Sequence, residues 1–590
     1  MKKEERIESG KAEKKVSKKK SATAKVPKKK KQKQSKASPL RIIPLGGLCE
    51  IGKNMTCFEY ENDMIIVDVG MAFAEENMPG VDAVIPDFNY VVENKDKLRG
   101  IFLTHGHEDH IGSLPYLLDV LKCPIYGGKL TVELVRHKLQ DKGVSLQGIS
   151  LLACKNGDFI KAGTNFFVEF IRVNHSIADS YALAIRTPVG MVIHSGDFKV
   201  DYTPINGKTI NLQRFGELGK EGVLLFMCES TNVEIPGVSP SEMHVGESFQ
   251  RIFQETKGRI IVATFSSHVH RMQQIFDAAE KYGRHVCLSG RSMINTFNVA
   301  NSLGYISMLP DTLIDTSELD NYDPDEIVIL TTGSQAEPMS ALSRIAFASH
   351  KSIEIQAGDT VIISAHPIPG NEKPIYRVIN ELFRRGAHVI YESLADVHVS
   401  GHAYRNELKL LHSLIKPKYF IPVHGEYRML YKHKELAKSL GTEEDNIFIL
   451  NNGDVLEVRP NKARINGNVP AQAVLIDGSS TSDIGNRIFS DRRMLGEDGC
   501  IAISITLDRN GNLYCPPQVN SLGFIFEDEK EELHKACGAK AMALLASDKA
   551  KNKDLESYAY SRQFRESIKS FLVEKTKRRP GILVCVTNLV

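Results

Sequence analysis

The stretch 104–112, THGHEDHIG, places three histidines and two acidic residues within six positions, His105 to His110. Imidazole nitrogens and carboxylate oxygens are ligands that zinc and other first-row divalent cations accept in proteins. Side chains alternate along a strand, so these histidines cannot all face one ion unless the chain turns. A turn would let the donors point two ways. The spacing therefore indicates two metal ions, about 3.5–4 Å apart, that could hold an attacking and a leaving oxygen.

The neighbouring sequence predicts where this cluster lies. IFLT (101–104) is typical of a short strand, and IGSLPYLLDVLK (111–122) has the apolar spacing of a helix. The cluster is therefore expected on a loop between a strand and a helix, a common place for functional residues.

Two ions need more ligands than this cluster supplies. Three further candidates each follow an apolar run: His175 in VNHS, Asp197 in MVIHSGDFK and His424 in FIPVHGE. A single histidine is more often structural than a ligand. As a set, however, these residues lie where the loops of a packed sheet would converge, which favours a shared metal centre.

Length and composition limit the class of protein. A chain of 590 residues is too long for one core, so three or four domains are expected. No apolar run approaches the roughly 18 residues of a membrane span, and the start lacks the apolar core of a secretory signal. None of the ten cysteines forms a CxxC pair. We therefore expect buried thiols in the reducing cytoplasm and neither a zinc ribbon nor disulfides.

The charge of the chain is concentrated at one end. Residues 1–38 contain 16 Lys or Arg and 4 Glu, a net charge of +12 in a chain whose total is +3. Like-charge runs with few apolar residues stay disordered and often act as interaction arms. We expect a disordered basic tail that attracts RNA or DNA phosphates without reading sequence. The alternative is a solvated tail without a role.

Deletion of residues 1–38 should weaken RNA binding and flatten its salt dependence, because fewer counterions would be released on binding. Chemistry on short substrates should be unchanged. Filter binding of one RNA across a salt series would check this expectation, and unchanged affinity at low salt would contradict it.

Two other patterns bear on the fold. Gly47–Asn54 has the GxxxxGK spacing of a phosphate-binding loop, but Asn54 stands where Ser or Thr would hold magnesium, and a strand is expected to follow instead of a helix. We therefore reject nucleotide binding there. Later apolar runs alternate with helical stretches, which predicts a parallel sheet covered by helices. These runs are GRIIVATF, RHVCLSG, EIVILTTG, DTVIISA and AHVIYES.

The ordered motifs resemble a known family. The HxHxDH cluster, with Asp68 before it and His175 and Asp197 after it, resembles the metallo-β-lactamase superfamily. CESTN, VSGHAYRNE and PVHGEYR resemble its β-CASP branch of nucleic-acid nucleases. Further motifs resemble bacterial ribonuclease J, from about residue 39 to the C-terminus and most densely to about 430. They are PLGGLCEIGKN, TFSSHVHRMQQ, GRSM, TTGSQAEPMSAL, PIPGNE and HVSGH.

This resemblance implies an α/β architecture: a metallo-β-lactamase αββα sandwich with an inserted β-CASP parallel α/β domain and a small α/β C-terminal domain. The expected boundaries are the tail at 1–38, the sandwich at 39–210 and 388–458, the insert at 211–387, a linker at 459–472 and a C-terminal oligomerisation domain at 473–590.

The resemblance also implies residue roles. His105, His107 and His175 match the ligands of one zinc, and Asp109, His110 and His424 match those of a second, with Asp197 bridging both. Asp68 would orient histidine ligands. His402, held by Glu229, would protonate the departing 3′ oxygen. The pocket expected to hold the 5′ phosphate of RNA comprises Ser266, Ser267, His268, Val269, His270, His398, Val399, Ser400, Gly401 and His402.

The departures from the family pattern are small. Glu229 stands where many relatives have Asp, and Ala336 replaces a frequent glycine. Because no metal-ligand position is missing, an inactive enzyme is not expected.

The implied function is a metal-dependent ribonuclease of RNA maturation, rRNA processing and mRNA decay. Attack by a metal-generated hydroxide on the scissile phosphorus would leave a 5′ phosphate, which fits the proposed pocket, so one cut would prepare the next. This predicts 5′-to-3′ exonuclease activity that prefers 5′-monophosphate RNA, with additional endonuclease activity. Two Zn²⁺ per subunit are expected, with Mn²⁺ possible. Expected partners are single-stranded RNA, a second or further copies in a homodimer or homotetramer, and other RNA-decay proteins or ribosomes, but no membrane.

Three alternatives remain. A small-molecule metallo-hydrolase would share the metal motifs but would need neither an inserted domain nor Glu229 and His402. A DNA-processing β-CASP nuclease is disfavoured by His424, which DNA-acting relatives often lack. A non-catalytic RNA scaffold with structural metals is disfavoured because structural zinc sites are usually closed and cysteine-rich.

Overall fold

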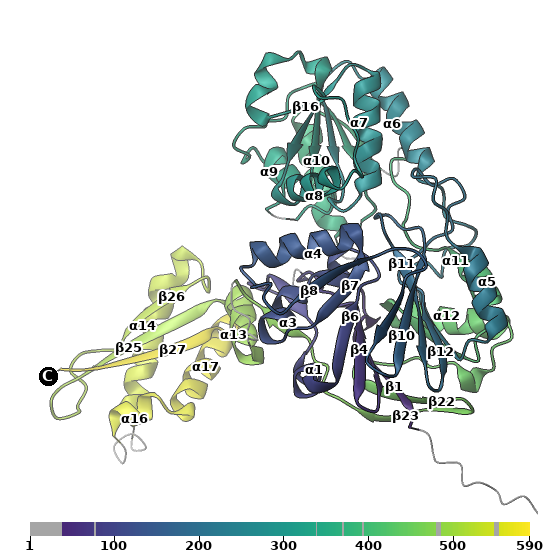
Figure 1. The fold of residues 1–590 in the computed structure, drawn as a ribbon. Coiled ribbons are helices and arrows are strands. Elements are labelled where there is room, and N and C mark those ends of the chain that lie inside the picture. The colour runs from purple at the N-terminus through teal and green to yellow at the C-terminus, as the bar shows by residue number, and fades with distance from the viewer. Residues whose placement is uncertain are drawn as a thin grey trace, which may run out of the picture. The chain divides into compact units, whose positions relative to one another are not determined.

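A computed structural model describes residues 38–75, 78–337, 339–367, 371–391, 395–478, 485–547 and 554–589 of the chain. The predicted basic tail, apart from Ser38, lies outside the described residues. The residues from Pro39 onward form one structural unit, whose elements are labelled in Figure 1.

Two mixed sheets form the two inner layers of a sandwich (Figure 1). The larger sheet has the strand order β23-β22-β1-β3-β4-β6-β7-β8 and the smaller has β20-β13-β12-β11-β10-β9. In the larger sheet the strands are β1 (Leu40–Gly46), β3 (Met55–Tyr60), β4 (Asp63–Val67), β6 (Leu98–Phe102), β7 (Pro124–Gly128), β8 (Ser150–Cys154), β22 (Asp454–Arg459) and β23 (Lys462–Asn468). In the smaller they are β9 (Phe159–Ala162), β10 (Phe166–Arg172), β11 (Tyr181–Thr187), β12 (Gly190–His194), β13 (Leu225–Glu229) and β20 (Tyr419–Val423).

The core between these sheets joins side chains from both. Phe102 of β6 stacks on Tyr126 with ring centroids 4.9 Å apart and lies 6.2 Å from Phe170 of β10. Helices cover the two outer faces, as the apolar clusters show. On the larger sheet these are α3 (Leu114–Val120) and α4 (Lys129–Asp141); on the smaller, α5 (Leu212–Glu221), α11 (Arg405–Ile415) and α12 (Tyr427–Ser439). The predicted αββα sandwich is confirmed.

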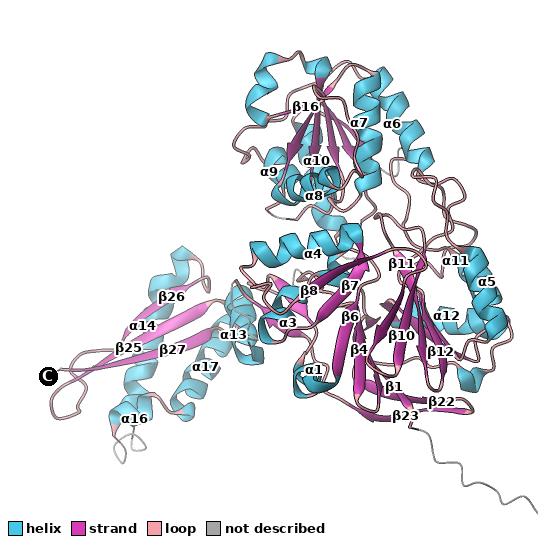
Figure 2. Ribbon diagram, in the orientation of Figure 1, coloured by secondary structure: helices cyan, strands magenta, loops and turns pink. Residues whose placement is uncertain are grey.

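The inserted domain is built on a third sheet, with the order β16-β15-β17-β14-β18-β19 and all pairs parallel. Figure 2 shows its strands with helices around them. The strands are β14 (Ile260–Ala263), β15 (His285–Ser289), β16 (Leu313–Ile314), β17 (Ile327–Thr331), β18 (Thr360–Ile363) and β19 (His388–Tyr391). The helices are α6 (Met243–Glu255), α7 (Val269–Lys281), α8 (Arg291–Ser302), α9 (Ala341–Ala346) and α10 (Glu372–Arg384). The parallel sheet predicted from the alternating apolar runs is confirmed.

Sheet membership differs from the predicted boundaries of the insert. β13, predicted inside the insert from residue 211, pairs in parallel with β12 and β20 of the sandwich. β19, predicted in the returning sandwich from residue 388, is instead the edge strand of the inserted sheet. An apolar run suits the interior of either sheet, so only its pairing partners decide where it belongs.

The predicted linker at 459–472 also differs from the structure. Lys462–Asn468 forms β23, which pairs antiparallel with β22 across a short hairpin. Its side chains are mostly exposed because β23 is an edge strand of the larger sheet. A polar edge strand lacks the apolar alternation that identifies strands in sequence.

The C-terminal domain contains a three-stranded sheet, ordered β26-β25-β27, with its own apolar core. Its elements are α13 (Gly485–Asp498), β25 (Cys500–Leu507), β26 (Gln518–Leu522), α14 (Glu527–Leu545), α16 (Leu555–Ala559), α17 (Arg562–Thr576) and β27 (Gly581–Asn588). The remaining elements are β2 (Leu48–Cys49), β5 (Ala83–Ile85), α1 (Asn89–Glu93), α2 (Glu108–Ile111), β21 (Gly425–Glu426) and β24 (Val474–Ile476). Among the described residues, none of these helices has the length and apolarity to cross a membrane.

Candidate metal centre and active site

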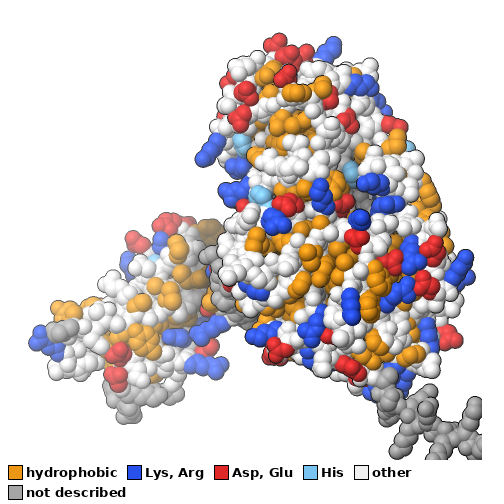
Figure 3. Space-filling view, viewed as in Figure 1, with side chains coloured by type: hydrophobic (Ala, Val, Ile, Leu, Met, Phe, Trp, Pro, Cys, Tyr) orange, Lys and Arg blue, Asp and Glu red, His pale blue; other side chains and the backbone are white. Residues whose placement is uncertain are grey.

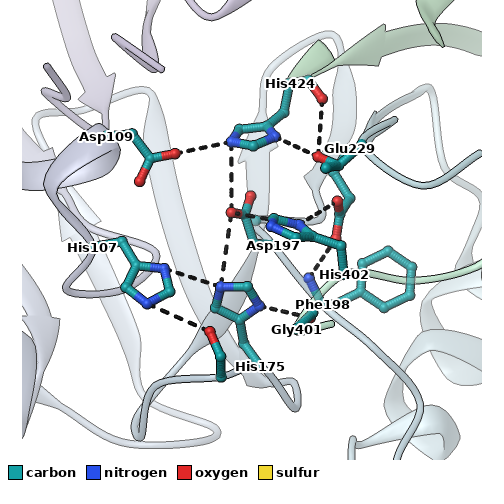
Figure 4. Close-up of polar contacts among 12 residues, drawn as sticks. His107, Asp109, His175, Asp197, Phe198, Glu229, Gly401, His402 and His424 are labelled. Atoms are coloured by element: carbon teal, nitrogen blue, oxygen red, sulfur yellow. Dashed lines mark hydrogen bonds and ion pairs between the residues drawn. The ribbon is translucent and has the colours of Figure 1, made fainter. Parts of the chain in front are cut away.

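The candidate ligands lie where strands of the sandwich end. Asp68 follows β4, His105 follows β6, Asp197 follows β12 and His424 follows β20. α2 begins at Glu108, so the chain turns within the cluster, as the sequence predicted. Strand ends that meet at one edge bring these distant segments together (Figure 4).

Three histidines form the first group of donors. His107 Nδ1 lies 3.0 Å from His105 Nε2 and 3.1 Å from His175 Nε2. The three ligand atoms are all within 4.8 Å of one another. They are the three residues that the resemblance assigns to one ion.

The second group contains Asp109, His110, His424 and Asp197, whose ligand atoms also lie within 4.8 Å of one another. Asp109 Oδ2 is 3.1 Å from His424 Nε2 and 3.4 Å from His110 Nε2. The structure therefore brings together all seven residues predicted to bind metal, in the two predicted sets.

Asp197 lies between the two groups. Its Oδ2 is 3.2 Å from His110 Nε2 and 3.6 Å from His424 Nε2 in the second group. The same oxygen is 3.7 Å from His105 Nε2 and 3.9 Å from His175 Nε2 in the first. One carboxylate oxygen so placed can face two cations at once.

The outer ring nitrogens are held by other groups. His110 Nδ1 donates to Asp68 Oδ2 at 2.8 Å, and His175 Nδ1 donates to the Gly401 carbonyl at 2.7 Å. His424 Nδ1 lies 2.7 Å from Thr231 Oγ1. Donation from Nδ1 leaves the Nε2 lone pair of the ring directed at the centre, which is the arrangement of metal-binding histidines.

The protonation of the site also suits a cation. Burial lowers the pKa of His107 to about 4 and holds the pKa values of His105 and His175 well below the usual range, so these rings are neutral. Burial alone would raise the pKa of Asp197, but the nearby His424 and His110 hold it well below its usual range. Burial opposes protonation of His110 and His424, but the charges of Asp197 and Asp109 raise the pKa values of both rings. Neutral imidazoles and ionised carboxylates are the forms that bind metal. The first group is therefore already in that form, and the second reaches it when a cation takes the place of the protons on His110 and His424.

The half-buried His402 and the buried Glu229 form a pair beside Asp197 (Figure 4). His402 Nδ1 lies 2.8 Å from Glu229 Oε2, while Glu229 Oε1 accepts a hydrogen bond from the Phe198 amide at 2.8 Å. Burial opposes protonation of His402, but the Glu229 charge and hydrogen bond raise its pKa to about 9. His402 is therefore a cation at neutral pH and can give up a proton.

Replacing Glu229 with Gln should move the alkaline limb of the kcat/KM profile to lower pH. The raised pKa of His402 keeps it protonated up to about pH 9, and the carboxylate supplies much of that rise. Without this charge the ring loses its proton at lower pH, by about one to two units. A pH–rate profile from pH 6 to 10 would check the shift, and an unmoved limb would show that His402 is not the acid.

The predicted phosphate pocket is only partly assembled. The rings of His268 and His398 lie 6.2 Å apart and nearly parallel, at 10°. Ser400 Oγ accepts hydrogen bonds from the Asn232 side chain and the His402 amide. His268 also lies 6.5 Å from His107, ring to ring, which connects this pocket with the first donor group.

Three of the predicted pocket residues are placed differently. The side chains of Val269 and Val399 are buried in the apolar core of the inserted domain, so only their backbones could face a ligand. His270 lines a small pocket together with His175, Lys199 and Glu242. Alternate residues at the start of α7 point to different sides of the helix, which explains the separation of His268 from His270.

Relatives of known family share this chain's sequence over most of its length. Ribonuclease J of Synechocystis is 43% identical over 84% of this chain and 77% of its own. Ribonuclease J 1 of Streptococcus pyogenes is 41% identical over 93% of this chain and 98% of its own. The chain belongs to the ribonuclease J family. Ribonuclease J of Thermus thermophilus agrees, at 40% identity over 93% of this chain and 95% of its own.

Family models match successive parts of this ribonuclease J family member. The models are the metallo-beta-lactamase superfamily at 52–201, the ribonuclease J beta-CASP domain at 257–382, the Zn-dependent metallo-hydrolase RNA specificity domain at 386–450 and the ribonuclease J C-terminal domain at 488–589. A solved structure described as a protein of unknown function from Enterococcus faecalis has a TM-score of 0.51, at 18% identity over 71% of this chain and all of its own. That likeness supports the fold alone.

Three residues that support the ribonuclease J centre escaped the sequence analysis. Thr104 donates to both oxygens of Asp68, and its hydroxyl lies 3.1 Å from His105 Nδ1. Thr231 holds His424, and the Asn54 side chain donates to the Asp109 carbonyl at 3.1 Å. Each of these residues lies within a motif that the sequence analysis quoted for another reason. Their place in those motifs was the sequence signal that could have identified them.

The Gly47–Asn54 loop serves this centre instead of a nucleotide. β3 follows the loop, as predicted, where a phosphate-binding loop would lead into a helix. The Asn54 amide donates to the Asp109 carbonyl, and Gly70 lies so close that an added Cβ would be 1.6 Å from that carbonyl oxygen. A glycine is therefore required at position 70, because any side chain there would collide with the backbone of the Asp109 segment.

Proposed function

We propose that this ribonuclease J family member holds two zinc ions and degrades RNA from the 5′ end, preferring a 5′ monophosphate, with additional internal cleavage. The observation that carries the proposal is the position of Asp197 Oδ2, within 3.9 Å of ring nitrogens from both donor groups. A single metal would not need one carboxylate oxygen between two complete sets. His/Asp ligands also distinguish the site from cysteine-rich structural zinc sites.

The chain offers one set of ligands for each ion. His105, His107 and His175 would hold the first, and Asp109, His110 and His424 the second, with Asp197 between them. Bound ions would supply Lewis acidity toward a phosphoryl oxygen and lower the pKa of a bound water. Zinc accepts this mixture of nitrogen and oxygen ligands, and manganese also suits the carboxylates.

His402 supplies the proton that the leaving 3′ oxygen needs. Its pKa of about 9 keeps the ring charged at neutral pH, and Glu229 fixes its orientation through Nδ1. The proton available to substrate is therefore on Nε2. The Phe198 amide holds the second oxygen of Glu229, so the carboxylate cannot rotate freely. General acids of this kind typically accelerate proton transfer steps about 10²–10⁴-fold.

The preference for the 5′ end would come from His268, His398 and Ser400. These side chains offer ring N–H and hydroxyl groups at the side of the first donor group, where His268 approaches His107. Each hydrolysis leaves a 5′ phosphate, which can then occupy this pocket. Successive cuts from the 5′ end follow, while RNA that threads past the pocket would be cut internally.

The test uses one RNA labelled at its 3′ end, with a 5′ monophosphate, a 5′ triphosphate or a 5′ hydroxyl. Each form is incubated with protein and zinc or manganese, with a chelator and His107→Ala as controls. We expect metal-dependent decay that is fastest for the monophosphate. Decay at the same rate for all three ends would remove the phosphate pocket but leave a nuclease. Absence of decay with every metal, together with cleavage of single-stranded DNA or small esters, would overturn the RNA substrate.

We also propose that the C-terminal domain joins copies of the chain into a dimer or tetramer. Large apolar side chains are exposed on its sheet and nearby, including Leu522 at 78%, Phe526 at 68% and Leu583 at 58%. Orange patches mark apolar side chains on this domain in Figure 3. Light scattering behind a sizing column should give two or four times the 65.7 kDa chain mass. A monomer at micromolar concentration would contradict this assignment.

A further inference from the structure

Arg271 is a fully buried charge beside the proposed phosphate pocket. It lies on α7, and only 1% of its surface is exposed. Its Nη2 donates to both carboxylate oxygens of Glu242, at 3.0 and 2.9 Å. Its Nη1 donates to the Ser364 carbonyl at 3.0 Å and lies 3.0 Å from His398 Nδ1. The mechanism proposed above uses none of these contacts.

The contact with His398 determines where the imidazole proton is. A guanidinium group has only N–H donors and no acceptor. A hydrogen bond from Arg271 Nη1 to His398 Nδ1 therefore requires Nδ1 to be unprotonated. A neutral ring with a bare Nδ1 carries its hydrogen on Nε2. The ring is half-buried, so part of it still faces solvent.

The other groups around His398 favour the same state. Burial and the Arg271 charge hold its pKa well below the usual range, and His366 from the loop after β18 and Lys199 from the loop after β12 act in the same direction. A hydrogen bond to the Ser364 carbonyl acts in the opposite direction and favours the protonated ring, but it is the smallest of these effects.

We propose that Arg271 is a positioning residue that holds His398 as a neutral imidazole with its proton on Nε2, directed at the 5′-terminal phosphate of RNA. This inference rests on the proposed phosphate pocket. Glu242 neutralises the guanidinium within the protein interior, and the 1% exposure leaves no path for direct contact with a ligand. The pocket would then recognise phosphate with neutral N–H and O–H donors and not with a cation.

The test measures discrimination, the ratio of dissociation constants for a 5′-hydroxyl and a 5′-monophosphate RNA 10-mer. Fluorescence anisotropy in excess chelator, from pH 5.5 to 8.5, gives this ratio without cleavage. The terminal phosphate itself titrates near pH 6. Dividing the discrimination of one protein by that of another at each pH removes the ionisation of the free RNA from the comparison.

The first comparison is wild type against His398→Ala. A ring that stays neutral contributes the same factor to discrimination at every pH. We therefore expect the discrimination of wild type to exceed that of the variant by a constant factor of about ten. A factor that grows as pH falls through about 6.5 would mean an ordinary titrating histidine and would overturn the proposal. Equal discrimination by both proteins would overturn the role of His398 in the pocket as well.

The second comparison removes Arg271 and its partner together, as Arg271→Met with Glu242→Gln, so that no unpaired carboxylate remains buried. We expect discrimination at pH 8 to fall, but by less than in His398→Ala, because the neutral ring remains and loses only its fixed tautomer and orientation. It should return to within about twofold of wild type at pH 5.5, where a released His398 becomes charged. The same loss at every pH would show that Arg271 acts only structurally and would overturn the proposal.

The matched control is another buried ion pair of the inserted domain. Arg259 donates to both oxygens of Asp359, at 3.0 and 2.7 Å, with side chains 8% and 3% exposed. Its guanidinium donates from Nε and Nη2, where Arg271 uses Nη2 alone, but it is a buried arginine–carboxylate pair that makes no contact with His398. Arg259→Met with Asp359→Asn should leave discrimination unchanged at every pH. A pH-dependent change in this control would assign the effect to domain stability and overturn the proposal.

Discussion

Replacing Asp197 with Asn is expected to lower kcat/KM at least about a thousandfold, or about 4 kcal/mol of transition-state stabilisation. Its Oδ2 lies within 3.9 Å of ring nitrogens in both donor groups, so the substitution removes the negative charge that the two ions would share. An amide placed there would also turn an N–H group toward the cations or present a weaker, neutral oxygen. Both ions should be held less tightly.

Metal content and turnover should be measured on the same preparation. Mass spectrometry of dialysed protein should give about two zinc ions per wild-type chain and fewer in the Asp197 variant. Asp63→Asn is the matched control, because Asp63 is also buried at the larger sheet but binds the turn at Thr164 and Asn165. It should keep its metals and activity within about threefold. Full metal content with normal activity in Asp197→Asn would refute the bridging role.

Replacing His402 with Ala should lower kcat by about 10²–10⁴-fold while metal content and KM change little. The ring is charged at neutral pH and is held by Glu229 at 2.8 Å, so its loss removes the proton donor and leaves the Glu229 carboxylate bound to the Phe198 amide. The defect should shrink on a phosphodiester with a p-nitrophenolate leaving group, because that group departs without protonation.

Single-turnover rates on RNA and on the activated diester separate this role from a structural one. A structural defect would lower both rates equally. His285→Ala provides a control, because His285 is a half-buried histidine of the inserted domain, bonded to the Asp311 carbonyl and remote from the centre. Loss of zinc from the His402 variant would instead assign this residue to the metal shell.

The sequence predicted which residues of the candidate site lie together better than it predicted the domain boundaries. His105 to His110 supply four donors in one short segment, and the other candidates each follow an apolar run, so the strand ends predict their meeting place. The predicted boundaries of the insert differ from the sheet membership of β13 and β19, because both are short apolar strands that fit either of two sheets. β23 was not predicted, for the opposite reason: its polar, exposed sequence carries no strand periodicity.

Spacing within short segments of the sequence determined the cluster of candidate metal ligands, the parallel inserted sheet and the family. These features depend on residues a few positions apart, where periodicity and turn geometry act directly. Tertiary structure alone decided the contacts between distant segments. Thr231 and His424 are 193 residues apart in the sequence, and Arg271 and His398 are 127 residues apart. Such pairs form only after strands from separate segments pair and pack, and their side chains then face one another across elements that no local pattern connects.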